Sequence, residues 1–86
     1  MYRVIFTPKA ADQYAKVIER FADAKKSLQT FETEIESVIR RLENMPESYA
    51  PKGTLRAARL VKSAYYLFFN LDEEKKVVSV VMLISQ

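Results

Sequence analysis

The segment YYLFFNLDEEKKVVSVVMLI, residues 65–84, decides the fold predicted for this 86-residue chain. Aromatic residues are frequent in its first part, charged residues follow at 72–76, and branched apolar residues dominate the rest. Two β-prone runs joined by a short charged turn are typical of an antiparallel hairpin. The segment therefore predicts strands over 64–71 and 77–84. The second strand is apolar on both faces and belongs in the middle of a sheet.

Two helices are predicted upstream of this hairpin, after a short β-prone run at 4–6. Thr7 is a good N-cap and Pro8 suits the first helical position, so the first helix begins there. Ser27 can cap a second helix, which keeps a 3.6-residue apolar period until Pro46 stops it. The break between the two helices is short, which predicts an antiparallel helical hairpin.

The remaining residues complete a single domain that spans residues 1–86, a usual length for one domain. Residues 46–54 contain two prolines and a glycine and are predicted to form a loop. Residues 55–61 mix basic and small side chains, as in a partly exposed strand. The fold class is therefore α+β, with an N-terminal strand, a helical hairpin and a three-stranded antiparallel meander (βααβββ). One sheet packed against two helices is the natural arrangement of these elements.

The residue types that are absent exclude several classes of function. The chain has no cysteine and no histidine. Disulfides, thiolate catalysis and zinc ribbons are therefore excluded, and the usual general base near neutral pH is missing. Gly53 is the only glycine, which rules out a glycine-rich phosphate loop. Carboxylates alone, such as those of Glu32 and Glu36, bind metal ions weakly. We therefore expect no cofactor and no metal.

No segment is suited to crossing a membrane. The longest apolar stretch, residues 77–84, is far shorter than the roughly 20 residues that a membrane-spanning helix needs. The N-terminal apolar run is too short for a signal peptide. We therefore expect a cytoplasmic protein without a membrane partner.

The net charge of +3 is concentrated in one segment. Residues 46–63 carry four basic side chains against the single acid Glu47, which gives this segment a local charge of +3. Such a patch suits nucleic acid or an acidic partner. The candidate nucleic-acid-binding residues are Lys52 and Lys62, and the candidate catalytic residues are Arg56, Arg59 and Tyr66.

These candidates have a functional and a structural interpretation. Arginine binds phosphate bidentately and stabilises developing charge, which is how a ribonuclease without histidine could work. Alternation along a strand puts Arg56 and Lys62 on one face and Arg59 on the other. The structural alternative is an edge strand protected by its charges against aggregation. Among the neighbouring aromatic residues, which mainly suit a core, Tyr66 is the expected exception because its hydroxyl prefers water or a partner.

Three segments together resemble the RelE/ParE superfamily, the toxins of type II toxin–antitoxin systems. They are VIFTPKAA at 4–11, the stretch from Ile35 to Leu42 with Pro46, and the hairpin from Tyr65 to Val81. The resemblance covers essentially the whole chain. It implies a bacterial toxin that arrests growth until a cognate antitoxin wraps it. The antitoxin would lie along the apolar groove between helices and sheet, or add a strand at the sheet edge.

The resemblance leaves three activities open. The first is a ribosome-dependent mRNA endoribonuclease, with ribosome and mRNA as partners and Arg59 at a basic position of the family. The second is a ParE-like inhibitor of DNA gyrase, which needs no catalytic residues. The third is an inactive relative that still binds its antitoxin.

Two departures weaken the ribonuclease interpretation. The ribonuclease members resemble one another in a basic residue directly after the strand-opening tyrosine, where this chain has Tyr66. They also carry a basic segment beyond the last strand, where this chain has only Ser85 and Gln86.

Overall fold

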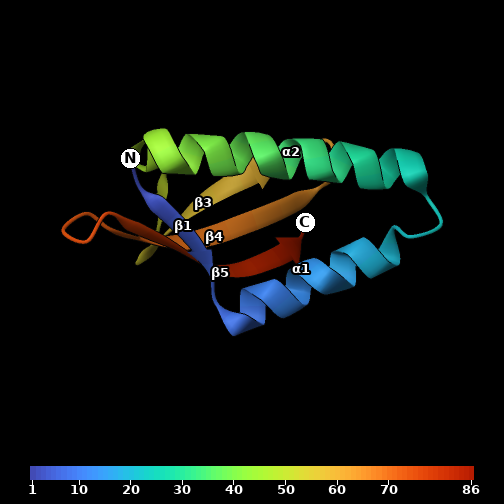
Figure 1. Cartoon of the computed structure of the whole chain (residues 1–86), viewed down its shortest axis with the longest axis horizontal. Helices are drawn as coiled ribbons and strands as arrows, with labels where there is room; N and C mark the ends of the chain where they lie inside the picture. Colours follow the sequence, from blue (N-terminus) through green and yellow to red (C-terminus); the bar gives the residue numbers. More distant parts are fainter.

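The sheet and the two helices form two layers, and the computed structural model describes all residues from 1 to 86. The elements in chain order are β1 (Arg3–Phe6), α1 (Pro8–Arg20), α2 (Lys25–Asn44), a 3-10 helix (Pro46–Ser48), β2 (Pro51–Lys52), β3 (Leu55–Leu60), β4 (Tyr65–Asp72) and β5 (Val77–Ser85). The two helices diverge from their connection, with α2 at the top and α1 at the bottom of Figure 1 and the strands between them. The predicted α+β class and the predicted helices and strands are confirmed.

The five strands form one sheet in the order β1-β5-β4-β3-β2. Strands β3, β4 and β5 are the predicted antiparallel meander. Strand β1 extends it by pairing in parallel with β5, with Ile5 opposite Ser79. Parallel strands cannot be joined by a tight turn, so the long connection that contains both helices is what allows this pairing. The predicted central place of β5 is therefore correct.

The two helices begin differently. The Thr7 hydroxyl accepts a hydrogen bond from the Ala10 N–H at 3.2 Å, and Pro8 opens α1 as predicted. The predicted Ser27 cap of α2 is wrong, because α2 already begins at Lys25 with Ala24 as its N-cap and without a side-chain cap. The Leu28 N–H donates to the Ala24 carbonyl at 2.9 Å, which adds the earlier turn to the helix. Neither helix has the length and apolar character that crossing a bilayer requires.

The predicted loop at 46–54 contains two short elements that sequence reasoning missed. Its start forms the 3-10 helix, and Pro51 and Lys52 pair with Arg56 and Leu55 as β2. Gly53 has a φ of 66°, a left-handed conformation that glycine adopts without strain. This glycine therefore turns the chain back on itself within two residues, which a composition-based loop prediction does not reveal.

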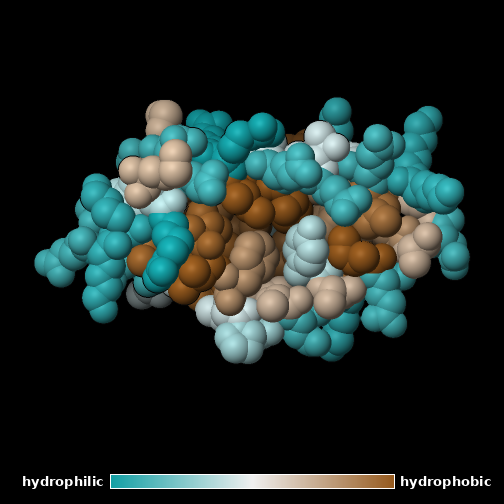
Figure 2. Space-filling model, in the orientation of Figure 1, coloured by the Kyte–Doolittle hydropathy of each residue, from teal (hydrophilic) through white to brown (hydrophobic).

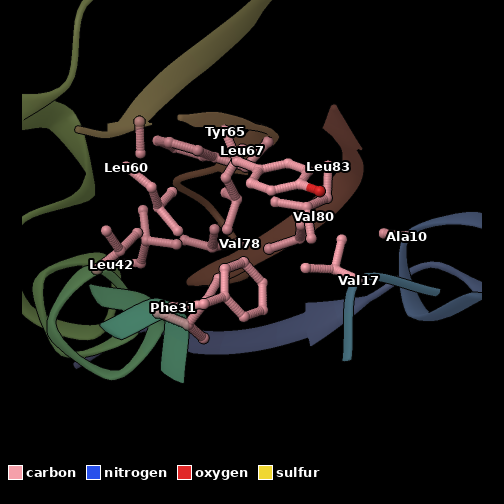
Figure 3. Packing of buried hydrophobic residues seen from close by; sticks show 14 residues of the cluster. Ala10, Val17, Phe31, Leu42, Leu60, Tyr65, Leu67, Val78, Val80 and Leu83 are labelled. Atoms are coloured by element: carbon pink, nitrogen blue, oxygen red, sulfur yellow. The ribbon is translucent and has the colours of Figure 1, made fainter. Parts of the chain in front are cut away.

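The core lies between the helices and one face of the sheet. Figure 3 shows the ring of Phe31, from α2, pointing toward the strand residues Val78 and Val80. All three side chains are fully buried. The Phe31 ring also meets the Tyr65 ring edge-on, with 5.7 Å between the ring centroids. Each buried side chain of this size contributes about 1.5–3 kcal/mol through the hydrophobic effect, so this face of the sheet fixes where the helices sit.

Candidate functional site

The face of the sheet opposite the helices is not covered by any other element. Its side chains alternate with the buried ones along each strand, and they are half-buried or exposed. We call this surface the open face. Its members include Ile5, Ala57, Arg59, Tyr66, Phe68, Met82 and Ile84, and the polar residues Arg3, Lys52, Asn70 and Ser79 lie on the same face. Ile5 is 41% exposed and Ile84 is 40% exposed. The open face is therefore apolar around Tyr66 and Ile84 and exposes one side of β5, which differs from the two-sided burial that we expected for this strand.

Arg59 and Tyr66 are direct neighbours on the open face. They are opposite each other in the β3–β4 register, and Tyr66 is opposite Ile84 in turn. The Arg59 guanidinium donates a hydrogen bond from Nη2 to Oε1 of Gln86 at 3.2 Å. The Tyr66 ring lies beside the Phe68 ring, with 6.0 Å between centroids. One guanidinium bordered by aromatic and apolar side chains can bind an anion or an acidic side chain within a hydrophobic contact.

Arg56 lies on the other face of β3 and is engaged by the fold. Its Nη1 donates a hydrogen bond to the Tyr49 carbonyl at 2.7 Å and a longer one to the Glu47 carbonyl at 3.4 Å. The Arg41 guanidinium lies over the Tyr49 ring, 5.3 Å from the ring centroid. Arg56 thus ties the segment after α2 to the sheet. Its opposite orientation to Arg59 agrees with the strand alternation expected from the sequence.

Lys62 lies in the turn between β3 and β4, beside α2. Its N–H and the N–H of Ser63 donate to the Glu34 carboxylate at 3.0 and 2.8 Å, and the Ser63 hydroxyl donates at 2.6 Å. Burial by itself raises the pKa of Glu34, but these hydrogen bonds outweigh it and hold the pKa below its ordinary value. Lys52 is exposed in β2 and is opposite Leu55, so it lies on the open face but at the other end of β3 from Arg59. Of the five candidate residues, only Arg59 and Tyr66 are therefore brought together.

A second surface is an apolar groove between the helices. It has a volume of 250 Å³ and is lined only by hydrophobic residues, namely Phe6, Ala11, Tyr14, Ile35 and Ile39. Figure 2 shows this apolar strip between hydrophilic borders. The Tyr14 ring meets the Phe6 ring edge-on at 5.9 Å. Burial raises the pKa of Tyr14, and the carboxylates of Glu32 and Glu36 raise that pKa further.

Sequence reasoning expected a groove between helices and sheet but did not name the residues that line it. The available signal was the small side chain of Ala11 on the apolar face of the first helix, since a small residue there leaves room above Phe6. No group of three or more potential ligand residues is arranged to hold a metal ion.

Known proteins share this architecture. The chain matches the family model described as ParE toxin of type II toxin–antitoxin system, parDE, over residues 4–86. Curated proteins give no significant match. The chromosomal ParDE system from P. aeruginosa superposes with a TM-score of 0.76 at 12% identity, covering 99% of this chain and 96% of that one. The intact E. coli RelBE toxin–antitoxin complex gives 0.70 at 19% identity, covering 100% and 98%.

The structural neighbours share the fold with this chain, and the family model matches nearly its whole length. The chain therefore belongs to the ParE toxin family of type II toxin–antitoxin systems.

Proposed function

We propose that this toxin arrests growth by binding a protein target, DNA gyrase, through its open face, rather than by cutting RNA. The observation that carries the proposal is the composition of the part of that face around Tyr66, where apolar and aromatic side chains border the guanidinium of Arg59. Protein interfaces are enriched in aromatic residues and arginine at an apolar centre. Phosphate backbones are instead bound by clusters of lysine and arginine.

The ribonuclease alternative has one observation in its favour. Arg59 and Tyr66 are cross-strand neighbours, and a guanidinium beside a phenol is a pair that could stabilise a phosphate and move a proton. Against it, the Arg56 guanidinium is held by backbone carbonyls on the opposite face. Lys62 lies beside α2 and not beside Arg59. The binding toxin therefore accounts for more of the surface.

We further propose that the apolar groove binds the cognate antitoxin. An amphipathic segment that lays its apolar face in a groove is a common recognition mode, and every side chain lining this groove is hydrophobic. The RelBE complex, which has a similar fold, contains a toxin with its antitoxin. Growth arrest by this route takes place in the cytoplasm and needs neither a metal nor a cofactor.

A pulse of expression without antitoxin in a bacterial host tests the activity. We expect growth arrest together with gyrase-linked DNA breaks, and no new mRNA 5′ ends within translated regions. Inhibition of purified gyrase supercoiling by the purified chain is the matching measurement in vitro. New 5′ ends at preferred codon positions would establish the ribonuclease instead, and absence of arrest with soluble protein present would leave an inactive antitoxin-binding relative.

Two variants that introduce the same charged residue on different surfaces test which surface of the toxin contacts gyrase. Ile84→Asp puts a charge on the open face, and Met45→Asp puts the same charge after α2, where Met45 is 54% exposed. We expect Ile84→Asp to abolish gyrase inhibition and Met45→Asp to retain it. Equal activity of both variants would move the contact away from the open face.

A further inference from the structure

The helix surfaces that border the apolar groove differ in charge between α1 and α2. On α1 the row that faces α2 continues from Ala11 through Ala15 and Ile18 at helical spacing, and these residues carry no charge. On α2 the flank that faces α1 carries Glu32 and Glu36, one turn apart and next to Ile35 and Ile39. The lining of the groove is hydrophobic, but its border on α2 carries two glutamates, which we call the acidic wall.

The cations of the two helices do not pair with this acidic wall. Lys16 and Arg20 of α1 line the opposite flank, beside the end of β5. Lys26 of α2 lines its own opposite flank, beside the β3–β4 turn. Arg40 follows Glu36 by one helical turn and Lys25 precedes Glu32 by two turns, but neither cation forms an ion pair with these glutamates. The acidic wall is therefore open to a cation from a partner.

The carboxylates of the acidic wall have no ionic partner within the chain. The only ion pair in the structure joins Lys16 to Asp12 within α1, at 3.2 Å. Glu32 and Glu36 repel each other across one helical turn. Both also act on the Tyr14 hydroxyl inside the groove, where they raise the pKa of that phenol beyond the effect of burial. The groove of the free protein is thus bordered by unpaired negative charge.

We infer that the groove selects an antitoxin segment that is apolar on one face and carries a lysine or arginine on the flank that contacts Glu32 and Glu36. The inference rests on the proposed binding of antitoxin in this groove and names the residues that decide which antitoxin fits. Apolar side chains of the segment fill the space over Phe6 and beside Ile35. The cation relieves the repulsion between the two glutamates, which makes the contact selective, because a segment with an acid at that place is repelled.

The test uses the polypeptide encoded by the reading frame adjacent to that of this chain as the probe. Its affinity is measured by calorimetry at low and high salt for the unmodified chain and for two double variants. Glu32→Lys with Glu36→Lys reverses the acidic wall. Glu73→Lys with Glu74→Lys makes the same charge change in the exposed turn between β4 and β5, far from the groove.

We expect the groove variant to weaken binding at least tenfold at low salt, with the loss shrinking at high salt because screening removes the charge term. The turn variant should stay within about twofold of the unmodified chain, because rim charges far from a contact act mainly on association rates. All four glutamates are exposed, so thermal melting should be unchanged and should separate lost binding from lost folding.

Three outcomes would overturn the inference. Equal affinities of the groove and turn variants would mean that the acidic wall plays no part, while antitoxin binding itself stood. Self-association of the unmodified chain, lost in the groove variant, would assign the groove to a second copy. Absence of any binding by the unmodified chain would overturn the proposed antitoxin function and this inference with it.

Discussion

Glu34, in the middle of α2, accepts hydrogen bonds from both the N–H and the hydroxyl of Ser63 in the β3–β4 turn, at 2.8 and 2.6 Å. These bonds fasten the longer helix to the end of the sheet at which Arg59 and Tyr66 lie. They also favour the ionised carboxylate, which is why the pKa of Glu34 lies below its ordinary value despite partial burial.

Glu34→Gln should therefore lower the free energy of unfolding by about 1 kcal/mol at neutral pH, a value reduced for partial solvent exposure. Because the pKa of Glu34 is lower in the folded state than in the unfolded state, its carboxylate stabilises the fold at pH values above the unfolded-state pKa. This contribution is lost as the pH falls through the folded-state pKa. Urea unfolding at pH 7 and at successively lower pH checks the sign, since the difference from the unmodified chain should shrink as the pH falls through the lowered pKa of Glu34. Glu36→Gln, which removes no hydrogen bond, is the control and should show no such loss.

Arg56→Ala should destabilise the fold by about 1–3 kcal/mol, because it leaves the Tyr49 and Glu47 carbonyls without their donor. Growth arrest, scaled to the amount of folded protein, should be unchanged. Chemical unfolding and growth curves at matched soluble levels measure the two effects. Loss of growth arrest with unchanged stability would show that Arg56 takes part in the toxic activity and is not only structural.

Arg59→Ala should give the opposite result. Its guanidinium is exposed and meets only the Gln86 side chain within the chain, so the free energy of unfolding should change by less than about 0.5 kcal/mol. Toxicity should fall at least tenfold, because Arg59 is the guanidinium that lies beside Tyr66 in the apolar part of the open face. Lys62→Ala, a cation removed from the neighbouring turn, is the matched control and should remain toxic. Full toxicity of Arg59→Ala with normal antitoxin binding would move the active surface to the helices.

Phe31→Ala should be the most destabilising of these changes, at about 3–5 kcal/mol. Phe31 is fully buried and contacts the rings of Tyr14, Phe21 and Tyr65. A domain of this size has little stability to spare, so the variant should be largely unfolded at 37 °C. Circular dichroism during thermal melting measures the loss. Phe31→Leu keeps most of the volume and should remain folded at that temperature.

The sequence predicted those parts of the fold that depend on periodicity and strong local signals. Thr7 and Pro8 mark the start of α1, and Pro46 ends α2, because each acts through its own backbone chemistry. The prediction that Ser27 caps α2 was wrong because the helix begins before this residue. The Ala24 carbonyl accepts a hydrogen bond from the Leu28 N–H, which adds a turn on the N-terminal side of Ser27. The pairing of β1 with β5 joins residues more than 70 positions apart, which no local pattern encodes.

The candidate site was predicted less completely, for a similar reason. Strand alternation by itself places Arg56 and Arg59 on opposite faces of β3. The capture of Arg56 by the Tyr49 carbonyl depends on the 3-10 helix and on β2, two elements that were expected to be loop. The apolar groove depends on the angle between the helices, which is set by the packing of Phe31 and its neighbours on the sheet.

The parallel pairing of β1 with β5 also bears on how the toxin is made. Residues 3–6 leave the ribosome first, yet their partner strand, residues 77–80, is synthesised after all the other elements. Pairings so distant in sequence form slowly, because a long loop must close before the contact stabilises it. A nascent chain or a fragment that ends before β5 lacks the centre of the sheet and the open-face residues Met82 and Ile84. The complete sheet therefore forms only after the last strand has been synthesised.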